Sequence, residues 1–339
     1  MALASLHIHN FRIIDDLSID LSPGVNLFYG NNGSGKSSII EAAHCLARGK
    51  SFRTSKTDTL IQQGKSYFCI RAALTNRVEV ACQRQAGSGR ALVNGSSATM
   101  LSVASKVPAI FMDSDSHRLF FSSPSVRRSY VDWVLFHVKP GYADVRGRYN
   151  KALKSRNSAL KAQLSTAPWD PLLADLGDQI ISSRRACLNA LFAHFHGTAS
   201  VFNLPVDAHY QPSVEEGGLL QALKDSAMAD KVSKITQKGP HRDDIVVCGG
   251  GGRLSQGQQK LIYSALAMAS WECLSEGGQK PVIMLDDVAA ELDDNNRGLL
   301  MGMVQATGAQ SLVTGVLKGD VERLAAGPMF HVDQGVVSN

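Results

Sequence analysis

The chain contains 339 residues, of which 44% are hydrophobic and 19% charged, with a formal net charge of +5. This length suggests about two globular domains with a sizeable core. The six scattered cysteines form no C-x-x-C pair, which argues against a disulfide or zinc framework and favours small core residues in a reducing compartment. No apolar run approaches the ~20 residues of a membrane helix, and residues 1–10 lack a secretory pattern, so we expect a soluble cytoplasmic protein.

The first part of the chain alternates short apolar or β-branched segments with turns. This pattern predicts a series of strands interrupted by one early helix. The expected strands are residues 6–11, 17–21, 25–29, 66–74, 77–83, 90–93 and 107–112, and the expected helix covers 38–46.

A glycine-rich segment separates the third strand from that helix and matches the P-loop pattern G-x-x-x-x-G-K-[ST]. Its glycines allow successive backbone N–H groups to surround phosphate oxygens, and the positive end of the helix faces the same anion. Lys36 is expected to reach the β- and γ-phosphates of ATP, and the Ser37 hydroxyl to bind Mg²⁺. The predicted nucleotide-binding residues are Gly30, Asn31, Asn32, Gly33, Ser34, Gly35, Lys36, Ser37 and Ser38.

The sequence becomes helical and basic after residue 124. Residues 127–161 contain nine basic residues against two acidic ones, and apolar residues recur at helical spacing through 145–164 and 171–195. A run of charge is usually a solvated helix face, but phosphate binding explains a balance this one-sided. We therefore expect contacts with the DNA backbone from Arg146, Arg148, Lys151, Lys154, Arg156 and Lys161.

A strand at 206–211, a helix at about 214–234 and a strand at 244–248 follow. We therefore expect an α/β P-loop ATPase head with an antiparallel β subdomain, interrupted by a helical arm. The head is predicted to comprise 1–123 and 236–339, and the arm 124–235 is predicted to be a basic, coiled-coil-like hairpin.

Residues 282–287 are four apolar residues followed by two aspartates. This pattern predicts a buried parallel strand that carries its carboxylates to the phosphate site. We expect Asp286 to bind Mg²⁺ and Asp287 to orient the attacking water, with the swapped roles as the alternative. Alone, the pattern is equally typical of an Asp-rich turn.

Residues 254–258 read L-S-Q-G-Q before a helix expected at 261–274. Ser255 and Gly257 at a helix N-terminus form a second anion site, or only an N-cap. P-loop, then L-S-x-G-Q, then two acids is the order found in ATP-binding-cassette (ABC) ATPases, which this chain resembles. In that superfamily the L-S-x-G-Q segment of one subunit closes on the γ-phosphate held by the other, which implies that Ser255 and Gly257 act in trans.

Five further segments resemble the RecF family, an SMC-like branch of this superfamily. They are Asn10-Phe11-Arg12, the P-x-x-R-R-x-x-[LV]-D-W element at 124–133, the basic arm helix Lys151–Lys161 with Arg156-Asn157, Gly239-Pro240-His241-Arg242-Asp243-Asp244, and the D-D-x-x-[AS]-E-L-D segment at 286–293. The resemblance covers the whole chain, although Ser114-Asp115 replaces a Pro-Glu pair usual in the family.

This resemblance implies an ATP-dependent homodimer on double-stranded DNA or double-strand/single-strand junctions, with slow ATP hydrolysis and a nucleoid-associated location. It also implies RecR and RecO as partners and RecA loading at gaps coated by single-strand-binding protein. Arg12 is expected to lie near the nucleotide base or to be an ordinary surface residue, and His241 is expected to make either a turn or a functional contact.

Two other function classes remain open on the sequence. A transporter nucleotide-binding subunit would carry a histidine after the strand expected at 310–314, where Thr314-Gly315 stands, and its glutamine loop would be one of Gln62, Gln63, Gln83 or Gln85. A P-loop phosphotransferase would have no use for the L-S-x-G-Q segment.

Overall fold

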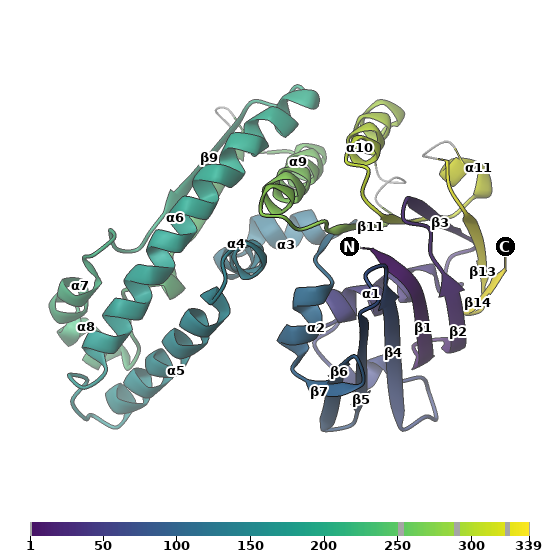
Figure 1. Cartoon of the computed structure of the whole chain (residues 1–339). Helices are drawn as coiled ribbons and strands as arrows, with labels where there is room; N and C mark the ends of the chain where they lie inside the picture. The colour runs from purple at the N-terminus through teal and green to yellow at the C-terminus, as the bar shows by residue number, and fades with distance from the viewer. Residues whose placement is uncertain (1, 250–253, 288–291, 323–325, 339) are drawn as a thin grey trace. The chain divides into compact units, whose positions relative to one another are not determined.

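The computed structural model describes residues 2–249, 254–287, 292–322 and 326–338 (Figure 1). The chain divides into two compact units: unit 1 comprises Met1–Ser116 with Leu274–Asn339, and unit 2 comprises His117–Cys273. Unit 2 contains the predicted arm together with residues 117–123 and 236–273, which the sequence pattern predicts to be part of the head. The predicted boundaries of the head and the arm therefore differ from those of the two compact units. The division into head and arm stays a prediction.

Unit 1 contains two six-stranded sheets, as expected for a P-loop head with an antiparallel subdomain. One sheet has the order β2-β1-β4-β5-β6-β7 and is antiparallel, and the other has the order β14-β13-β3-β12-β11-β8 and is parallel except for β14. The strands are β1 Leu3–Phe11, β2 Ile14–Asp20, β3 Val25–Tyr29, β4 Tyr67–Leu74, β5 Glu79–Gln85, β6 Ser88–Val93, β7 Ser96–Ala98, β8 Ala109–Asp113, β11 Val282–Asp286, β12 Ser311–Gly315, β13 Met329–Asp333 and β14 Val336–Ser338.

Helix α1 (Lys36–Arg48) joins the core of unit 1. Its apolar residues belong to the same buried cluster as side chains of β1, β4 and β11, so the helix that follows the P-loop is fixed by packing. It ends at Gly49, whose positive φ of 70° is the left-handed C-cap conformation that glycine adopts without strain. The other helices of unit 1 are η1 Thr57–Leu60, α2 Met100–Lys106, α10 Asp294–Ala306 and α11 Lys318–Glu322.

Unit 2 consists of helices around the two-stranded antiparallel sheet β10-β9. The two predicted long helices are present and pack on each other: α5 spans Tyr142–Lys161, and α6 spans Asp170–Val201 with Pro171 in its first turn. The remaining elements are α3 Ser116–Ser122, which begins at the last residue of unit 1, α4 Pro124–Val138, β9 Val206–Gln211, α7 Leu219–Asp225, α8 Ala227–Ser233, η2 Pro240–Arg242, β10 Asp244–Gly249 and α9 Gln256–Glu276.

One predicted helix is wrong in its extent. Residues 214–234 form the two short helices α7 and α8, which meet at Ser226. Ser226 hydrogen-bonds through its side chain to the carbonyl oxygen of Leu223, and such local bonds of serine compete with continuing the helix. No described helix is long and apolar enough to cross a membrane.

Candidate functional site

The P-loop forms a tight cradle between β3 and α1. Gly30 has φ of 151°, and a Cβ atom there would lie 2.1 Å from the carbonyl oxygen of Val332, so no other residue fits without moving the backbone. Gly35 precedes α1 with φ of 115°. The Lys36 ammonium donates to the carbonyl oxygens of Gly30 at 2.7 Å and Asn31 at 2.9 Å, which holds it over the loop.

The two acids stand at the carboxyl end of β11, one strand removed from β3 in the sheet. Thr314, at the end of the intervening strand β12, holds both of them. Its hydroxyl donates to the Asp286 carboxylate at 2.9 Å and accepts the backbone N–H of Asp287 at 2.9 Å. Asp287 has φ of 58°, a left-handed conformation uncommon outside glycine, asparagine and aspartate. In the sequence, Thr314 is noticed only because it stands where a transporter subunit would carry a histidine.

The electrostatics of this group suit a bound cation. Burial raises the pKa of Asp286 above its ordinary value, and hydrogen bonds from Thr314 and Ser37 oppose that shift. Burial likewise lowers the pKa of Lys36, while the carboxylates of Asp287 and Asp286 oppose the change. Ser37 and Asp286, the two predicted Mg²⁺ ligands, are therefore in contact with each other.

A cavity of about 670 Å³ connects these groups, with lining residues from the P-loop, Asp287 and Thr314. Arg12 also lines it, but its guanidinium makes a two-pronged ion pair with the buried Glu41 of α1, at 2.9 and 2.7 Å. Arg12 is therefore not an unattached surface residue, and its place near the nucleotide base stays a prediction. The cavity is completed by residues that the sequence analysis did not assign to it, which are Ile13, Arg53, Thr54 and Thr59.

Arg53 approaches the same Glu41 at 3.8 Å and is partly exposed. Its charge is close enough to Asp286 to oppose the rise that burial causes in the pKa of that carboxyl. Nothing in the local sequence pattern of Arg53 shows that the chain returns to the P-loop at this residue.

These residues fit a magnesium nucleotide. The cradle is one that a Cβ at Gly30 would fill, and the buried Ser34 hydroxyl has no hydrogen-bond partner among the described residues. Ser37 and Asp286 offer the oxygen ligands that Mg²⁺ prefers, and Lys36 supplies a point charge for phosphate oxygens.

The L-S-x-G-Q segment begins helix α9 in unit 2. The Ser255 hydroxyl accepts the backbone N–H of Gln258 at 3.2 Å, and the Gln258 side chain accepts the N–H of Ser255 at 2.9 Å. This reciprocal pair is a capping box. The N-cap interpretation accounts for the local geometry. Ser255 and Gly257 are both exposed, so the N-terminus of α9 is also accessible to a ligand.

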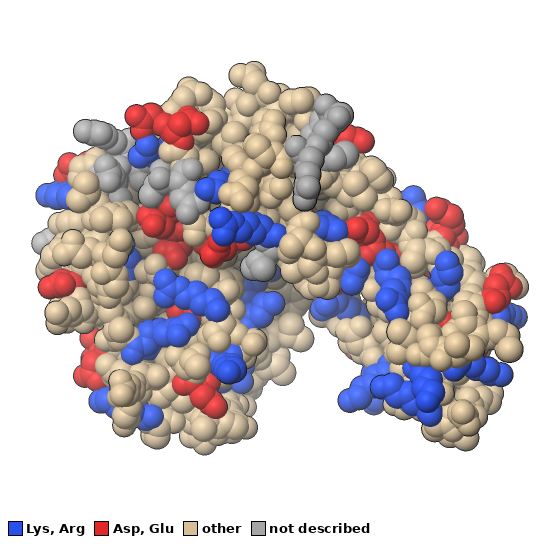
Figure 2. Space-filling view, turned by 180° about the vertical axis from the view of Figure 1, so that it is seen from behind, with Lys and Arg blue, Asp and Glu red and all other residues tan. Residues whose placement is uncertain are grey.

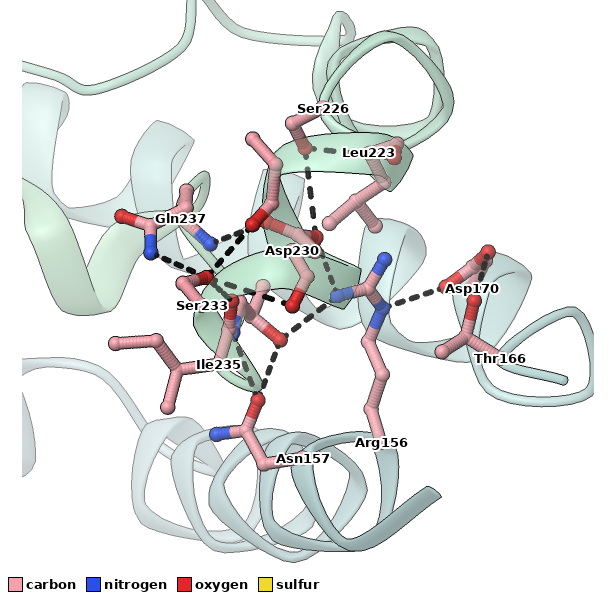
Figure 3. A network of polar contacts seen from close by, with 12 residues as sticks. Arg156, Asn157, Thr166, Asp170, Leu223, Ser226, Asp230, Ser233, Ile235 and Gln237 are labelled. Atoms are coloured by element: carbon pink, nitrogen blue, oxygen red, sulfur yellow. Dashed lines mark hydrogen bonds and ion pairs between the residues drawn. The ribbon is translucent and has the colours of Figure 1, made fainter. Parts of the chain in front are cut away.

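One predicted DNA contact is wrong. Arg156 is 0% exposed and its guanidinium is held by Asp170 at 2.7 Å, Asp230 at 2.7 Å and Thr236 at 2.8 Å (Figure 3). The network joins α5 to the start of α6 and to α8, so Arg156 ties the hairpin together. A charge count along the sequence cannot separate such a buried cation from a surface one.

The other basic residues of α5 reach the surface. Lys151, Lys154 and Lys161 are exposed, Arg148 approaches Asp144 at 3.8 Å, and the Arg146 side chain is 44% exposed while bonded to Asp132 at 2.8 Å. In Figure 2 many Lys and Arg side chains gather on the lower part of unit 2, at the right of the view. These exposed basic residues are therefore available to a polyanion.

The two RecF-like elements at 124–133 and 239–244 meet inside unit 2. Arg127 pairs with Asp244 at 2.8 and 2.9 Å, and Arg184 of α6 pairs with both Asp132 and Asp243. The His241 ring donates through Nε2 to the Thr236 carbonyl at 3.0 Å, and its Nδ1 shares a hydrogen bond with the Tyr149 hydroxyl at 2.7 Å. His241 is thus fixed on both ring nitrogens, which favours the turn over a direct functional contact.

A P-loop leading into α1, an acid pair on a strand of the same parallel sheet, and an adjoining antiparallel sheet define an ATPase head of the ABC class. Comparison with known families agrees: the sequence model of the "RecF/RecN/SMC N terminal domain" matches residues 2–336. The chain belongs to this family and, within it, to RecF of the SMC-like ABC ATPases.

The relatives support this assignment along the whole chain. The DNA replication and repair protein RecF of Coxiella burnetii is 32% identical over 99% of both chains, and that of Saccharophagus degradans is 34% identical over 99% of this chain and 98% of its own. A solved structure of the recombination mediator protein RecF with ATP, in the RecFOR pathway, superposes with a TM-score of 0.90 at 29% identity over 99% and 98% of the two chains. An Smc head, at 15% identity and a TM-score of 0.63 over 100% and 96%, shares the fold alone.

Proposed function

We propose that this protein is an ATP-dependent DNA-binding recombination mediator of the RecF type. ATP drives two copies together on double-stranded DNA or on double-strand/single-strand junctions, and slow hydrolysis releases them. The observation that carries the proposal is the cavity lined by the P-loop, Lys36, Thr314 and Asp287, with Asp286 held beside it by the Thr314 hydroxyl.

The P-loop and the two acids have distinct tasks in this proposal. The P-loop N–H groups and Lys36 bind and orient the phosphates, and Ser37 with Asp286 would hold Mg²⁺. The metal ion, when bound, neutralises charge that develops on the phosphate oxygens. Asp287 accepts a hydrogen bond from the attacking water and orients it, in the position that Thr314 imposes on its backbone.

Slow hydrolysis follows from the length of this side chain. Asp287 is one methylene shorter than the glutamate that transporter-type ABC ATPases use as the base. Its carboxylate therefore reaches the attacking water less closely, and the bound dimer persists. Persistence suits a clamp that marks a site on DNA, and turnover suits its removal. Ser255 and Gly257 of a second copy would complete the γ-phosphate site in trans.

The RecFOR pathway named for the solved relative suggests partners. We propose RecR and RecO as the partners, with loading of RecA at gaps coated by single-strand-binding protein as the outcome in DNA repair and replication restart. Contacts with DNA are expected to be to the backbone, because phosphate contacts position a protein without reading sequence.

Sedimentation as a function of ATP concentration, with and without duplex DNA, tests the proposal. Wild type should dimerise with Mg²⁺–ATP, and Lys36→Met should not, because the charge on the β- and γ-phosphates is lost. Lys106→Met, an exposed lysine of α2, is the matched control and should dimerise normally. Normal ATP-dependent dimerisation of Lys36→Met would contradict the role of the P-loop in assembly.

A further inference from the structure

Unit 2 contains a small cavity that the nucleotide site does not use. It measures about 200 Å³ and is lined by α4, α5, α6 and the turn at 240–241. Two of its walls are rigid, because Arg184 and Tyr149 are almost fully buried. The arginines on its surface are Arg128, Arg146 and Arg184, and its only carboxylate is Asp132.

The charges around this cavity do not balance. Asp132 is paired with Arg184 and Arg146, Asp243 with Arg184, and Asp244 with Arg127. These pairs account for three carboxylates and three arginines. A fourth arginine of the cluster, Arg128, is left over.

Arg128 is in an unfavourable position for a cation. Its one hydrogen bond within the described residues goes to the backbone carbonyl of Asp243 at 2.6 Å, and no described carboxylate lies within 4.0 Å of it. Burial and the neighbouring Arg184 lower the pKa of Arg128, whereas the carboxylates of Asp243, Asp244 and Asp132, which are paired with other arginines, oppose that shift. An anion in the cavity would relieve this repulsion and accept the remaining N–H donors of the guanidinium fork.

The neighbour His241 does not supply the missing charge. One of its ring nitrogens must donate to the Thr236 carbonyl, so the other accepts from the Tyr149 hydroxyl in the neutral ring. Burial lowers the pKa of His241, which agrees with this neutral form. The unpaired donor capacity of the cavity therefore rests with Arg128 and the outer side of Arg146.

Helix α5 connects the cavity to the basic surface. Arg146 and Asn150 line the cavity, and Lys154 and Lys161 follow at spacings of four and seven residues on the same helical face. At 1.5 Å per residue, Lys154 lies about 12 Å along the helix from Arg146. Arg148 lies on the opposite side of α5, because two residues of helix correspond to about 200° of rotation.

We propose that this cavity binds one phosphate of a polynucleotide backbone, with Arg128 and Arg146 as its ligands, and that Lys154 and Lys161 contact phosphates further along the same strand. The inference rests on the proposed DNA-binding function and assigns the anchor point of that interface. It also separates the two adjacent arginines of the sequence element: Arg127 is structural and Arg128 binds the ligand.

Duplex affinity measured from low to moderate salt tests the anchor, with the protein held dimeric by a slowly hydrolysed ATP analogue. Arg128→Gln should weaken binding by about tenfold or more, because a charge-assisted hydrogen bond is lost. It should also flatten the slope of log K against log salt by about 0.9. Arg128→Lys should recover the slope but only part of the affinity, and Lys224→Gln, an exposed charge of α7, should change neither.

Thermal unfolding in chloride buffer distinguishes a ligand-binding role from a structural one. Arg127→Gln should lower Tm clearly, because Asp244 loses its partner, whereas Arg128→Gln should leave Tm within about a degree of wild type. An equal loss of Tm in both variants overturns the proposal. So does inorganic phosphate that stabilises wild type through Arg128 while the DNA affinity of Arg128→Gln is unchanged, since the cavity would then hold free anion.

Different results contradict the proposed DNA-binding function and the anchor at Arg128. If wild type shows no salt-dependent duplex binding, the DNA-binding function is wrong and the anchor falls with it. If wild type binds duplex and Arg128→Gln binds with the same affinity and slope, the cavity is not part of the interface and the proposed function stands.

Discussion

At the residue scale, Thr314 defines the difference between the two acids of the nucleotide cavity. Its hydroxyl donates to the Asp286 side chain, whereas it accepts only the backbone N–H of Asp287. The Asp286 carboxylate is thus fixed and buried beside Ser37, as a metal ligand requires, and the Asp287 side chain is carried into the cavity by its own left-handed backbone.

This asymmetry predicts different effects of two similar substitutions. Asp287→Asn should retain Mg²⁺–ATP binding and slow hydrolysis by about a hundredfold or more, because a general base contributes about that much. Asp286→Asn should instead weaken Mg²⁺-dependent nucleotide binding. Nucleotide affinity at several Mg²⁺ concentrations and single-turnover hydrolysis measure both effects, and an equal loss of Mg²⁺ dependence in the two variants would show that the roles are divided wrongly.

His44 of α1 links the same unit to pH. It is buried against Phe52 and Phe111, donates through Nδ1 to the Lys50 carbonyl at 2.9 Å, and burial lowers its pKa to about 3 from 6.5. The folded state therefore keeps His44 neutral while the unfolded chain takes up a proton below 6.5. Its contribution to stability is complete above that pH and is lost as the pH falls toward 3.

We predict that His44→Gln flattens the pH dependence of unfolding. Between about pH 6.5 and 4.5 the free energy of unfolding of wild type should fall by up to about 1.4 kcal/mol per pH unit from this group alone. Urea unfolding at a series of pH values measures the slope for the variant and for His209→Gln, an exposed histidine, as control. If the two variants keep the same slope as wild type, His44 does not hold a depressed pKa.

At the scale of elements, the sequence predicts the order of strands and helices well because local patterns decide them. The P-loop, β11 and the long helices α5 and α6 each carry their signal within a few consecutive turns or alternations. Arg156 and Arg53 show the limit of such patterns. Whether a cation is buried on Asp230 or returns to line the cavity beside the P-loop depends on contacts between distant segments, which no local periodicity records.

In helix α5, the structure shows which basic side chains share a face and which do not. The basic run predicts DNA contact, but its cations do not share one face. Arg156 is buried in an ion pair with Asp230, Lys154 and Lys161 lie on one exposed face of α5, and Arg148 lies on the opposite side. Lys151 lies between that exposed face and the opposite side. We therefore expect fewer phosphate contacts than the charge count suggests.

Two double variants that remove the same charge test this division. Lys154→Ala with Lys161→Ala should flatten the slope of log K against log salt by about 1.8, because each phosphate contact contributes about 0.9. Arg148→Ala with Lys151→Ala should flatten it clearly less. Duplex binding by the ATP-analogue dimer is the measurement, ATP binding without DNA is the control, and a larger effect of the second pair would place the interface on the other side of α5.

At the scale of the whole molecule, the groups that we propose to surround ATP belong to different compact units. The P-loop and the acids are in unit 1, whereas Ser255 and Gly257 begin α9 in unit 2. If the site is completed in trans, substitution at Ser255 should block assembly and leave nucleotide binding by the monomer nearly intact. Ser255→Arg introduces bulk, and Ser255→Asp retains an N-cap residue while placing a negative charge against the γ-phosphate. Sedimentation with ATP measures dimers, and loss of monomer ATP binding with dimers retained would contradict the trans arrangement.

A mixture of two inactive variants gives the sharpest test of this arrangement. Ser255→Arg keeps an intact P-loop, and Lys36→Met keeps an intact L-S-x-G-Q segment. In a heterodimer, the P-loop of the first variant faces Ser255 of the second, so one of the two composite sites is whole and the other has lost both of its parts. Mixing should therefore restore ATP-dependent dimers that neither variant forms alone, with at most half the wild-type number of ATP sites per dimer. If each site were completed within one chain, every chain in the mixture would carry a defect and no dimers would appear. Sedimentation of the two variants labelled with different dyes distinguishes these outcomes directly.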